Sequence, residues 1–599
     1  MRDLKGVTAG AAALTSNVSG VTAARAVATI LRRPAAASST RVALALVGGA
    51  SVSSNLATIG AASNLSYVGG GIYQASGTAD ISGSTFNGNV AWSGGGMYMM
   101  GGAVTIAGST FTNNGAEAYD GGAMVVASGV VTMSNSQVLT NSAATAGGGL
   151  YIVNGGVMTI ANSKVLANQS TANNTAIGGG IYNNGALFLN VVNVSQNSAW
   201  YAGGGVYNDG NGILMVARSL VNFNATEVGH STLYSYPYYV YGGAIWNNGA
   251  LTTTDSIFVG NHTFATGTTV TDFATYGYAI ANIATLEMSQ VYMADNTMGA
   301  IYNRGVADAS NSYIANNVAV NLGGAITNDT TGILSLSDSN LSMNVAVWVA
   351  NNTSSGGNTT GGGIYNSGVV TITGSSLIQN VAAPGPQGAN DWGSGGAIYN
   401  SGAVNLQNST VVASTQSKYG GGIDNFYSNP NCVGCNNDDY TGLRSSGSGL
   451  SAASAATAPV LTLNHATLVG NGQEDQHPVL RNGEGAVLHM RNSIIADSPC
   501  ANNGSIGANR HNLIEDGSCA DNGVNLHTGD ARLGALAYNG GSTPTVALLP
   551  GSPAADAAEL VTCLATDQRG FARPHGQGCD IGAFESQPWP RTFLPLVAR

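Results

Sequence analysis

The chain has 599 residues, of which 44% are hydrophobic and only 8% are charged, and its formal net charge is -11. This balance argues against intrinsic disorder, which goes with low hydrophobicity and high charge. It also argues against a nucleic-acid partner, because the 19 Lys and Arg form no basic run that would bind phosphates. No apolar stretch reaches the roughly 18 residues of a membrane-spanning helix, so no transmembrane segment is predicted.

Residues 1–60 are predicted to be an N-terminal leader or cap. Residues 22–33 have the pattern of one short amphipathic helix, which would cover the first repeat. Residues 41–47 have a basic start and a short apolar run, which together resemble a signal peptide. The alternative for this region is a disordered extension rich in Ala, Ser and Thr.

A five-residue motif of the form Gly-Gly-(Gly/Ala)-Ile-Tyr begins at Gly69 and recurs many times. The step from Ile72 to Met97 is 25 residues, and insertions lengthen several later steps. The aliphatic position is occupied by Ile72, Met97, Met124, Leu150, Ile181, Val206, Ile245, Ile280, Ile301, Ile326, Ile364, Ile398 and Ile423. A fixed period of this length is typical of solenoid architectures.

A second motif, Ser-x-apolar-x-x-Asn, lies half a period after the first. Its copies run from Ser84 to Asn89, Ser109 to Asn114, Ser136 to Asn141, Ser163 to Asn168, Ser219 to Asn224, Ser256 to Asn261, Ser312 to Asn317, Ser339 to Asn344 and Ser375 to Asn380. Asn side chains in stacked repeats can hydrogen-bond from one repeat to the next. We therefore expect an Asn ladder.

Short alternating segments such as Val104-Thr105-Ile106 lie between the two motifs and indicate strands. Gly and Asn at fixed offsets suit tight corners with positive φ. These features predict an all-β protein, a right-handed parallel β-helix over residues 61–500 with coils about 4.8 Å apart. The low charge fits, because like charges stacked at that spacing repel. A β-propeller is disfavoured, because its blades need roughly 40 residues or more.

The aromatic residue after the aliphatic position should point outward if the aliphatic residue points inward. The expected partial ladder consists of Tyr73, Tyr98, Tyr151, Tyr182, Tyr207, Trp246, Tyr302, Tyr365 and Tyr399. Such a ladder can serve as a platform for a glycan, or its rings can simply stack on one another between coils. Both interpretations stay open from the sequence.

Two insertions between coils contain candidate binding residues. One holds Tyr234, Tyr236, Tyr238, Tyr239 and Tyr241, and the other holds Asp424, Asp438 and Asp439. Aromatic rings can stack on sugars, and carboxylates can hold calcium, the one cofactor that the sequence suggests. The alternative is that both insertions cover the flank of the β-helix.

All six Cys lie in the last third of the chain. Their proximity in sequence suggests local disulfides joining Cys432 to Cys435, Cys500 to Cys519 and Cys563 to Cys579, although other connectivities stay open. Disulfides form in oxidising compartments. The alternative for the Cys-x-x-Cys pair is half of a zinc site or a redox motif.

Residues 501–585 form a distinct C-terminal module, followed by a tail at 586–599. The module contains Asn539-Gly540-Gly541, Asp567-Gln568-Arg569-Gly570 and a final run from Cys579 to Glu585. It resembles the choice-of-anchor Q domain of secreted bacterial surface proteins. That resemblance implies a domain that ends a β-helix and precedes an anchoring tail, although the tail here has no recognisable sortase motif.

The repeats themselves resemble those of the chlamydial polymorphic outer-membrane proteins over roughly residues 60 to 425. Gly-Gly-Ala-Ile and apolar-x-x-Asn keep a fixed order in both. This resemblance implies extracellular display with an adhesive or structural role.

The module also contains the densest charge cluster, formed by Asp556, Asp567, Arg569, Arg573, Asp580 and Glu585. We expect a structural Asp–Arg network that closes the open end of the β-helix, where a bare strand edge would invite association. The alternative is a pair of carboxylates acting as acid and base.

These observations predict a non-catalytic extracellular protein, secreted or at the cell surface, with no catalytic residues. Its expected partner is a polysaccharide or another surface protein, and a homo-oligomer is compatible with the repeats. One alternative is a polysaccharide lyase or glycoside hydrolase, which the scarcity of charge at repeating positions disfavours. Another is a filament subunit that stacks end to end.

Overall fold

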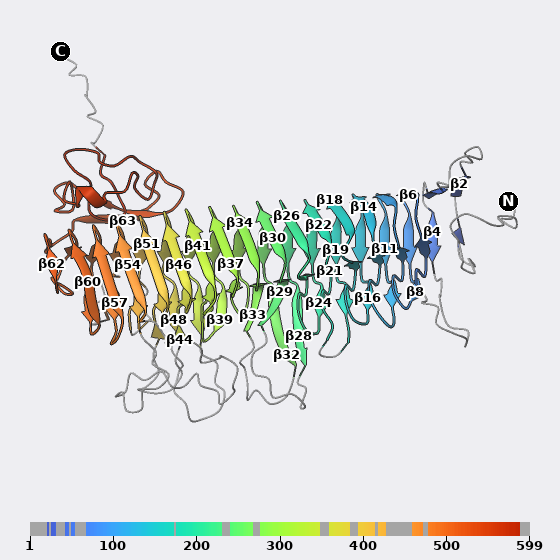
Figure 1. Ribbon diagram of the computed structural model, residues 1–599, viewed down its shortest axis with the longest axis horizontal. Helices are drawn as coiled ribbons and strands as arrows, with labels where there is room; N and C mark the ends of the chain where they lie inside the picture. The colour runs from blue at the N-terminus through green and yellow to red at the C-terminus, as the bar shows by residue number, and fades with distance from the viewer. Residues whose placement is uncertain are drawn as a thin grey trace, which may run out of the picture.

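Each repeat folds as one coil of a right-handed parallel β-helix, as predicted, in the computed structural model of the chain (Figure 1). The structure describes residues 50–53, 68–172, 175–229, 240–266, 276–347, 359–383, 393–413, 417, 419–426, 458–470 and 477–587, and the backbone of strands at 21–22, 26–30 and 42–46. A coil contains four strands in order, which we name the ladder, broad, narrow and short strands. The ladder, broad and narrow strands pair in parallel with their counterparts in the next coil and form continuous sheets, whereas the short strands fall into three separate sheets.

Ladder strands carry the Ile-Tyr motif. They are β5 (Ile72–Gln74), β9 (Met97–Met99), β13 (Met124–Val126), β17 (Leu150–Ile152), β21 (Ile181–Asn183), β25 (Val206–Asn208), β29 (Val240–Asn247), β33 (Tyr276–Asn282), β36 (Ile301–Asn303), β40 (Ile326–Asn328), β45 (Ile364–Asn366), β50 (Ile398–Asn400), β53 (Ile423–Asn425), β56 (Leu480–Asn482) and β59 (Cys500–Asn502).

Broad strands follow the ladder strands. They are β3 (Val42–Leu46), β6 (Thr78–Ser82), β10 (Ala103–Ala107), β14 (Gly129–Ser134), β18 (Gly156–Ala161), β22 (Ala186–Asn190), β26 (Ile213–Ala217), β30 (Ala250–Thr254), β34 (Thr285–Ser289), β37 (Val306–Ser310), β41 (Ile333–Ser337), β46 (Val369–Thr373), β51 (Ala403–Gln407), β54 (Val460–Asn464), β57 (Val487–Arg491), β60 (Ser505–Arg510) and β62 (Gly523–Val524).

Narrow strands begin just after the Ser of the second motif. They are β4 (Ser51–Ser53), β7 (Thr85–Asn87), β11 (Thr110–Thr112), β15 (Gln137–Leu139), β19 (Lys164–Leu166), β23 (Asn193–Ser195), β27 (Leu220–Asn222), β31 (Ile257–Val259), β35 (Tyr292–Ala294), β38 (Tyr313–Ala315), β42 (Asn340–Ser342), β47 (Ser376–Ile378), β52 (Thr410–Val412), β55 (Thr467–Val469), β58 (Ile494–Ala496) and β61 (Leu513–Ile514).

Short strands complete many of the coils. They are β8 (Val90–Ala91), β12 (Gly115–Ala116), β16 (Ser142–Ala143), β20 (Gln169–Ser170), β24 (Ser198–Ala199), β28 (Ala225–Gly229), β32 (His262–Thr266), β39 (Val318–Val320), β43 (Val345–Val347), β44 (Thr359–Thr360), β48 (Val381–Ala383) and β49 (Gly393–Ser394).

The hydrophobic core runs along the inside of the coils. In β10, Val104 and Ile106 are buried while Thr105 between them is exposed, which is the period-two alternation of a strand with one buried face. Parallel pairing then places like residues over one another, as where the rings of Phe86 and Phe111 stack with centroids 4.4 Å apart. Continuous stacks of this kind bury apolar area in every coil.

The predicted Asn ladder is present at the corner after the narrow strands. Asn141 is fully buried; its backbone N–H and its Nδ2 both donate to Oδ1 of Asn168, each at 2.9 Å. Oδ1 of Asn141 accepts the same two bonds from Asn114. The side chains therefore satisfy corner amides that strand pairing leaves open.

A second Asn ladder, which the sequence motifs did not indicate, lies at the end of the ladder strands. Each Nδ2 donates to Oδ1 of the Asn in the following coil, beginning with Asn183 to Asn208 at 2.7 Å. The ladder runs through Asn183, Asn208, Asn247, Asn282, Asn303, Asn328, Asn366, Asn400, Asn425, Asn482 and Asn502. Its members directly follow the Ile-Tyr motif, and the recurrence of Asn at that position is the sequence pattern that indicates this ladder.

The N-terminal region forms strands and not the helix predicted for residues 22–33. β2 (Ala26–Ile30) pairs antiparallel with β3, and β1 (Val21–Thr22) pairs antiparallel with β4. β3 and β4 pair in parallel with the next coil, so the β-helix begins before residue 61. The physical reason is that Val27, Thr29 and Ile30 are β-branched and favour strands, particularly where the bare edge of a first coil is available for pairing.

The C-terminal module packs on the flank of the last coils and does not close the open end, contrary to our expectation (Figure 1). The parallel sheets continue to β62, so the β-helix extends beyond residue 500 and the module on the flank begins after β62. That module contains the hairpin of β63 (Leu533–Ala537) with β64 (Thr545–Leu548) and the 3₁₀ turn η2 (Leu560–Thr562). Hydrogen bonds hold it on narrow strands: the hydroxyl of Ser376 donates to the carbonyl of Pro544 and accepts from Gln568, Thr410 donates to Gln568, and the amide of Ala583 donates to Thr467. Small hydroxyl side chains in these outward positions leave room for the module, where earlier coils carry residues as long as Lys164.

Candidate functional site

The aromatic side chains at the second position of the ladder strands form a stacked row on the outer face of the β-helix. Parallel register places Tyr151 beside Tyr182, Tyr182 beside Tyr207, and Tyr207 beside Trp246. The ring centroids of these three pairs are 4.5, 5.6 and 4.3 Å apart, with interplanar angles of 11°, 9° and 10°. Tyr73 and Tyr98 form a similar stack at 6.0 Å. We call the segment from Tyr73 to Trp246 the aromatic ladder.

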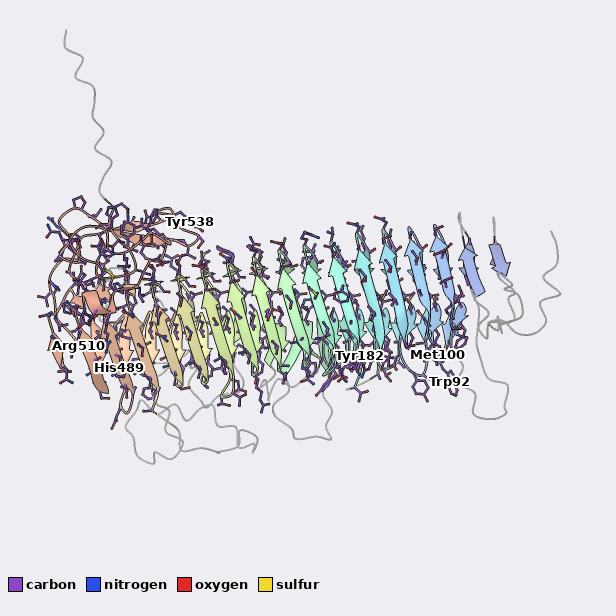
Figure 2. The ribbon with its side chains drawn as sticks, turned by 45° about the horizontal axis from the view of Figure 1, so that its top comes forward. Trp92, Met100, Tyr182, His489, Arg510 and Tyr538 are labelled. Atoms are coloured by element: carbon purple, nitrogen blue, oxygen red, sulfur yellow. A yellow bond between two sulfur atoms is a disulfide. The ribbon has the colours of Figure 1, made fainter. Side chains whose placement is uncertain are left out.

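Exposure varies from ring to ring along the row. Tyr73, Tyr98, Tyr151, Tyr207, Trp246 and Tyr365 keep part of their surface in solvent, whereas Tyr182, Tyr302 and Tyr399 are at most 7% exposed. Figure 2 labels Tyr182 of the aromatic ladder and, near the same long edge of the molecule, Trp92, which lies in a turn outside the ladder. Most rings of the aromatic ladder therefore remain partly accessible to a ligand.

Two carboxylates accept hydrogen bonds from ladder hydroxyls at equivalent places in two coils. The hydroxyl of Tyr182 donates to Oδ2 of Asp209, and that of Tyr302 donates to Oδ2 of Asp329, both at 2.5 Å. Each Asp directly follows an Asn of the second Asn ladder and begins a turn. The next broad strand starts five residues after that Asn, whereas it starts three residues after Asn183, so the turn that carries an Asp is longer. The longer turn carries the carboxylate to the edge of the row.

A third carboxylate, that of Asp120, lies at the opposite edge of the aromatic ladder, in the turn that enters β13. The hydroxyl of Thr145 donates to Oδ1 of Asp120, and the hydroxyl of Ser93 donates to its backbone carbonyl. Burial raises the pKa of the Asp120 carboxyl, and the hydrogen bonds from Thr145 and the Ala146 backbone oppose that rise.

An exposed aromatic pair stands next to Asp120. The rings of Trp92 and Tyr119 meet edge to face with centroids 6.1 Å apart, and Tyr119 is 53% exposed. The sequence reasoning missed these two rings and the three carboxylates, because they lie in turns outside both repeat motifs. The available signal was the Asn-Asp dipeptide, which occurs at Asn208-Asp209 and again at Asn328-Asp329.

The hydroxyls of Tyr151 and Tyr182 remain protonated over the whole physiological range. Burial, reinforced by the charges of Asp120 and Asp209, raises the pKa of Tyr151 to about 12. Burial also raises the pKa of Tyr182, and the hydrogen bond to Asp209 adds to that effect. Because the rings cover one another's faces, each neutral phenol presents its apolar ring edge and a hydroxyl that can donate a hydrogen bond, and a sugar can contact both.

The row ends in a buried ion pair at the next two register positions. Asp424 follows Tyr399, and Nε of Arg481 in the following coil lies 2.8 Å from Oδ1 of Asp424. The guanidinium also lies over the rings of Tyr419 and Phe426. Because this cation already neutralises Asp424, that carboxylate is poorly suited to hold calcium.

Several predicted site residues lie outside the described residues. They are Asp438 and Asp439, Cys432 and Cys435, and Tyr234, Tyr236, Tyr238 and Tyr239. Of Tyr241, only the backbone within β29 is described. Within the described segments, no three His, Cys, Asp or Glu side chains come together as they would around a metal ion. Calcium binding at the second insertion stays a prediction.

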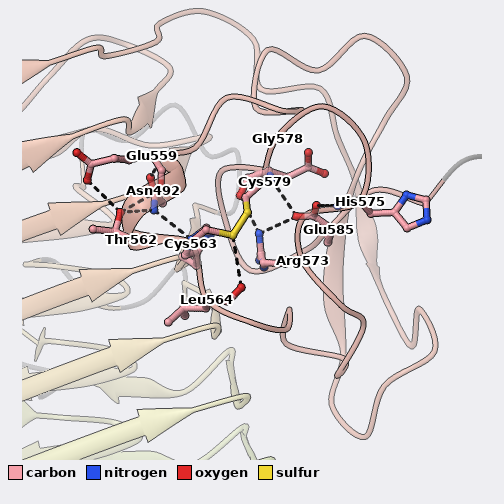
Figure 3. The surroundings of a disulfide bond; sticks show 12 residues. Asn492, Glu559, Thr562, Cys563, Leu564, Arg573, His575, Gly578, Cys579 and Glu585 are labelled. Carbon is pink, nitrogen blue, oxygen red and sulfur yellow. Dashed lines mark hydrogen bonds and ion pairs between the residues drawn. A yellow bond between two sulfur atoms is a disulfide. The ribbon is translucent and has the colours of Figure 1, made fainter.

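The predicted charge network of the module exists as a set of buried bonds. Arg573 and Glu585 are 2.9 Å apart with both side chains fully buried, and Arg569 pairs with Asp567 at 2.6 Å. Asp580 accepts from the amide of Asp556 and from both donors of Ser586. Arg573 lies beside the Cys563–Cys579 disulfide (Figure 3). Because Arg569 binds Asp567 and Arg573 binds Glu585, the charges of these two carboxylates are compensated. This geometry fits a structural network.

Two of the three predicted disulfides lie in the described residues and are present, Cys500–Cys519 and Cys563–Cys579. Cys500 and Cys519 belong to the main hydrophobic core at its C-terminal end. Disulfides and a β-helix are compatible with an extracellular protein.

Removing the first disulfide should loosen the last coil. The Cys500–Cys519 bridge spans 19 residues, and a loop of this size contributes about 3 kcal/mol by restricting the unfolded chain. In a Cys500→Ser/Cys519→Ser variant we expect amides of β59, β60 and β62 to exchange about a hundredfold faster with deuterium. The Cys563→Ser/Cys579→Ser variant is the control and should leave those three strands unchanged; equal exchange in both variants would contradict the prediction.

Comparison with known families agrees with the fold. Residues 49–227 match the family model of the right handed beta helix region. No curated protein matches the chain. In the part of the chain that the structure describes, no helix is long and apolar enough to cross a membrane.

Proposed function

We propose that this is an extracellular, non-catalytic β-helix protein of the cell surface that binds a polysaccharide along its aromatic ladder. The observation that carries the proposal is the in-register stack of Tyr151, Tyr182, Tyr207 and Trp246 on an outer face. A polymer of repeating sugar units can lie along the exposed edges and hydroxyls of several such rings at once, so weak individual contacts add up. The hydroxyls and edge carboxylates would supply directional hydrogen bonds.

Binding, and not hydrolysis, is the activity that these contacts support best. Asp209 accepts hydrogen bonds from the Tyr182 hydroxyl and the Gly210 amide, and it lies three coil steps from Asp120 on the other side of the row, so these two carboxylates do not face one bond. Asp567 and Glu585 of the module network are buried and paired with Arg569 and Arg573. A glycosidase needs two carboxyl groups that both face the same scissile bond. The resemblance of the module to choice-of-anchor Q domains supports a surface location.

Removing two rings from the ladder should weaken glycan binding. In a Tyr151→Leu/Tyr207→Leu variant we expect affinity for the retained polysaccharide to fall at least about tenfold, which corresponds to about 1.4 kcal/mol. Leu keeps an apolar cover over the strand and limits any loss of folding. Binding is measured by retention on immobilised neutral, basic and acidic polysaccharides, with new reducing or unsaturated ends assayed in parallel.

The matched control is Tyr292→Leu. Tyr292 is 40% exposed and stacks on Tyr313 at 5.4 Å, but it lies on a narrow strand away from the aromatic ladder. Equal loss in the control and the ladder variant would contradict the proposed site. Sugar release that the ladder variant abolishes would instead favour the hydrolase or lyase alternative.

A further inference from the structure

Resting on that proposed function, we infer that the aromatic ladder selects a polysaccharide with free amino groups, which Asp120 and Asp209 recognise from opposite edges of the row. The two carboxylates occupy different ends of the ladder strands. Asp120 precedes β13, whereas Asp209 directly follows the last residue of β25. Because ladder strands run parallel, these positions fall on the two sides of the same row of rings.

Tyr151 is the ring between them. Both carboxylates are near enough to Tyr151 for their charges to act on its hydroxyl. Three coil steps separate β13 from β25, or about 14 Å at the normal strand spacing. A chain of a few sugar units lying over Tyr151 and Tyr182 would therefore have one carboxylate near each end and on each side.

Charge in this half of the molecule favours a cation over an anion. Between residues 68 and 426 the sequence has fourteen Asp and Glu, and its basic residues are Lys164, Arg218, Arg304 and Lys418. Lys164 lies on a narrow strand, and Arg218 bonds to Asn190 at the end of a broad strand, so neither compensates the ladder carboxylates. A polyuronate would meet unbalanced negative charge here, and like charges brought together disfavour binding.

An aromatic face beside Asp120 adds a second attraction for an ammonium group. Trp92 and Tyr119 form their exposed edge-to-face pair at Asp120 and supply this face, whereas Tyr182 and Trp246 cover both faces of the Tyr207 ring beside Asp209. A cation over an aromatic face gains about 0.5–1 kcal/mol at an exposed site. N-acetylation would remove the charge and with it both attractions.

The test compares three oligosaccharides on the full-length protein by calorimetry: glucosamine oligomers, the same oligomers fully N-acetylated, and oligogalacturonate. We expect the glucosamine oligomers to bind at least tenfold more tightly than the N-acetylated ones, and oligogalacturonate to bind most weakly. In Asp120→Asn/Asp209→Asn the tenfold ratio should fall to near one, with affinity for the N-acetylated oligomer unchanged. Asn keeps the shape of each side chain, so folding should be preserved.

Asp255→Asn is the matched control, because Asp255 is an exposed carboxylate at the corner between broad and narrow strands, and it should keep the tenfold ratio. Two outcomes overturn the amine selectivity alone. One is equal affinity of the unaltered protein for the free and the N-acetylated glucosamine oligomers, and the other is a tenfold affinity ratio that persists in Asp120→Asn/Asp209→Asn. Tighter binding of oligogalacturonate overturns it as well. The Tyr151→Leu/Tyr207→Leu variant tests the binding site independently of the amine selectivity. Loss of all binding in this variant supports the aromatic ladder as the site, and unchanged binding overturns the proposed function itself.

Discussion

Replacing Asn141 with Ala is expected to lower the free energy of unfolding of the coils around it by about 3 kcal/mol or more. Its side chain donates to the carbonyl of Phe111 at 3.0 Å and to Asn168, and it accepts two bonds from Asn114. All these groups are buried, and each buried group left without a partner costs about 1–3 kcal/mol. Ala cannot replace any of these side-chain bonds.

The effect should be local along the solenoid. Because each coil contacts only its neighbours, hydrogen–deuterium exchange should rise most in the narrow strands β11, β15 and β19 and decline with distance from residue 141. Asn87→Ala is the control: Asn87 is exposed and accepts one long bond from Asn113, so its loss should change stability by less than about 0.5 kcal/mol. Similar exchange in both variants would show that the Asn ladder contributes little.

Replacing Arg573 with Met should release the C-terminal module from the flank of the β-helix. The guanidinium donates to Oε2 of Glu585 at 2.9 Å, to the carbonyl of Asp580 at 2.8 Å and to that of Gly582 at 2.7 Å. Removing one partner of a fully buried ion pair costs about 3–5 kcal/mol, because the other charge stays buried without compensation. Burial already raises the pKa of Glu585, so the variant should take up a proton there.

The readout is exchange at two amides that join the module to the coils. The amide of Gly582 donates to the carbonyl of Asn492, and the amide of Ala583 donates to Thr467. Both should lose most of their protection in Arg573→Met, whereas Arg532→Ala, which removes an exposed guanidinium bound to the carbonyl of Pro550, should leave them protected. A further Glu585→Gln change in the Met variant should restore part of the protection. Full protection in Arg573→Met would contradict the role of this pair in docking.

Most of the coil could be predicted because repetition carries the information. Ile72, Met97 and Met124 recur at nearly constant steps and indeed lie in register, as do Asn89, Asn114 and Asn141. Stacking like residues at a fixed spacing leaves few other arrangements for such a pattern. The outward row of Tyr followed from strand alternation alone, and its stacked rings confirm that part of the prediction.

The misplaced elements are the ones that break the period. The amphipathic spacing of residues 22–33 predicts a helix, but residues 26–30 pair with the edge strand β3, and that pairing outweighs the local preference. The carboxylates of Asp120 and Asp209 sit in turns of irregular length, so no repeat pattern marks them. Their proximity to the same ring depends on how three successive coils stack.

The sequence by itself therefore determined the coil, its register, the Asn ladder and the two local disulfides that the structure describes. Each of these depends on contacts between residues one period apart or close along the chain. Only the tertiary structure decided that the module lies on the flank, since its contact from Ser376 to Pro544 spans 168 residues and follows no period. It also decided which rings stay open to a ligand, because exposure depends on what packs over a side chain and not on the strand that carries it.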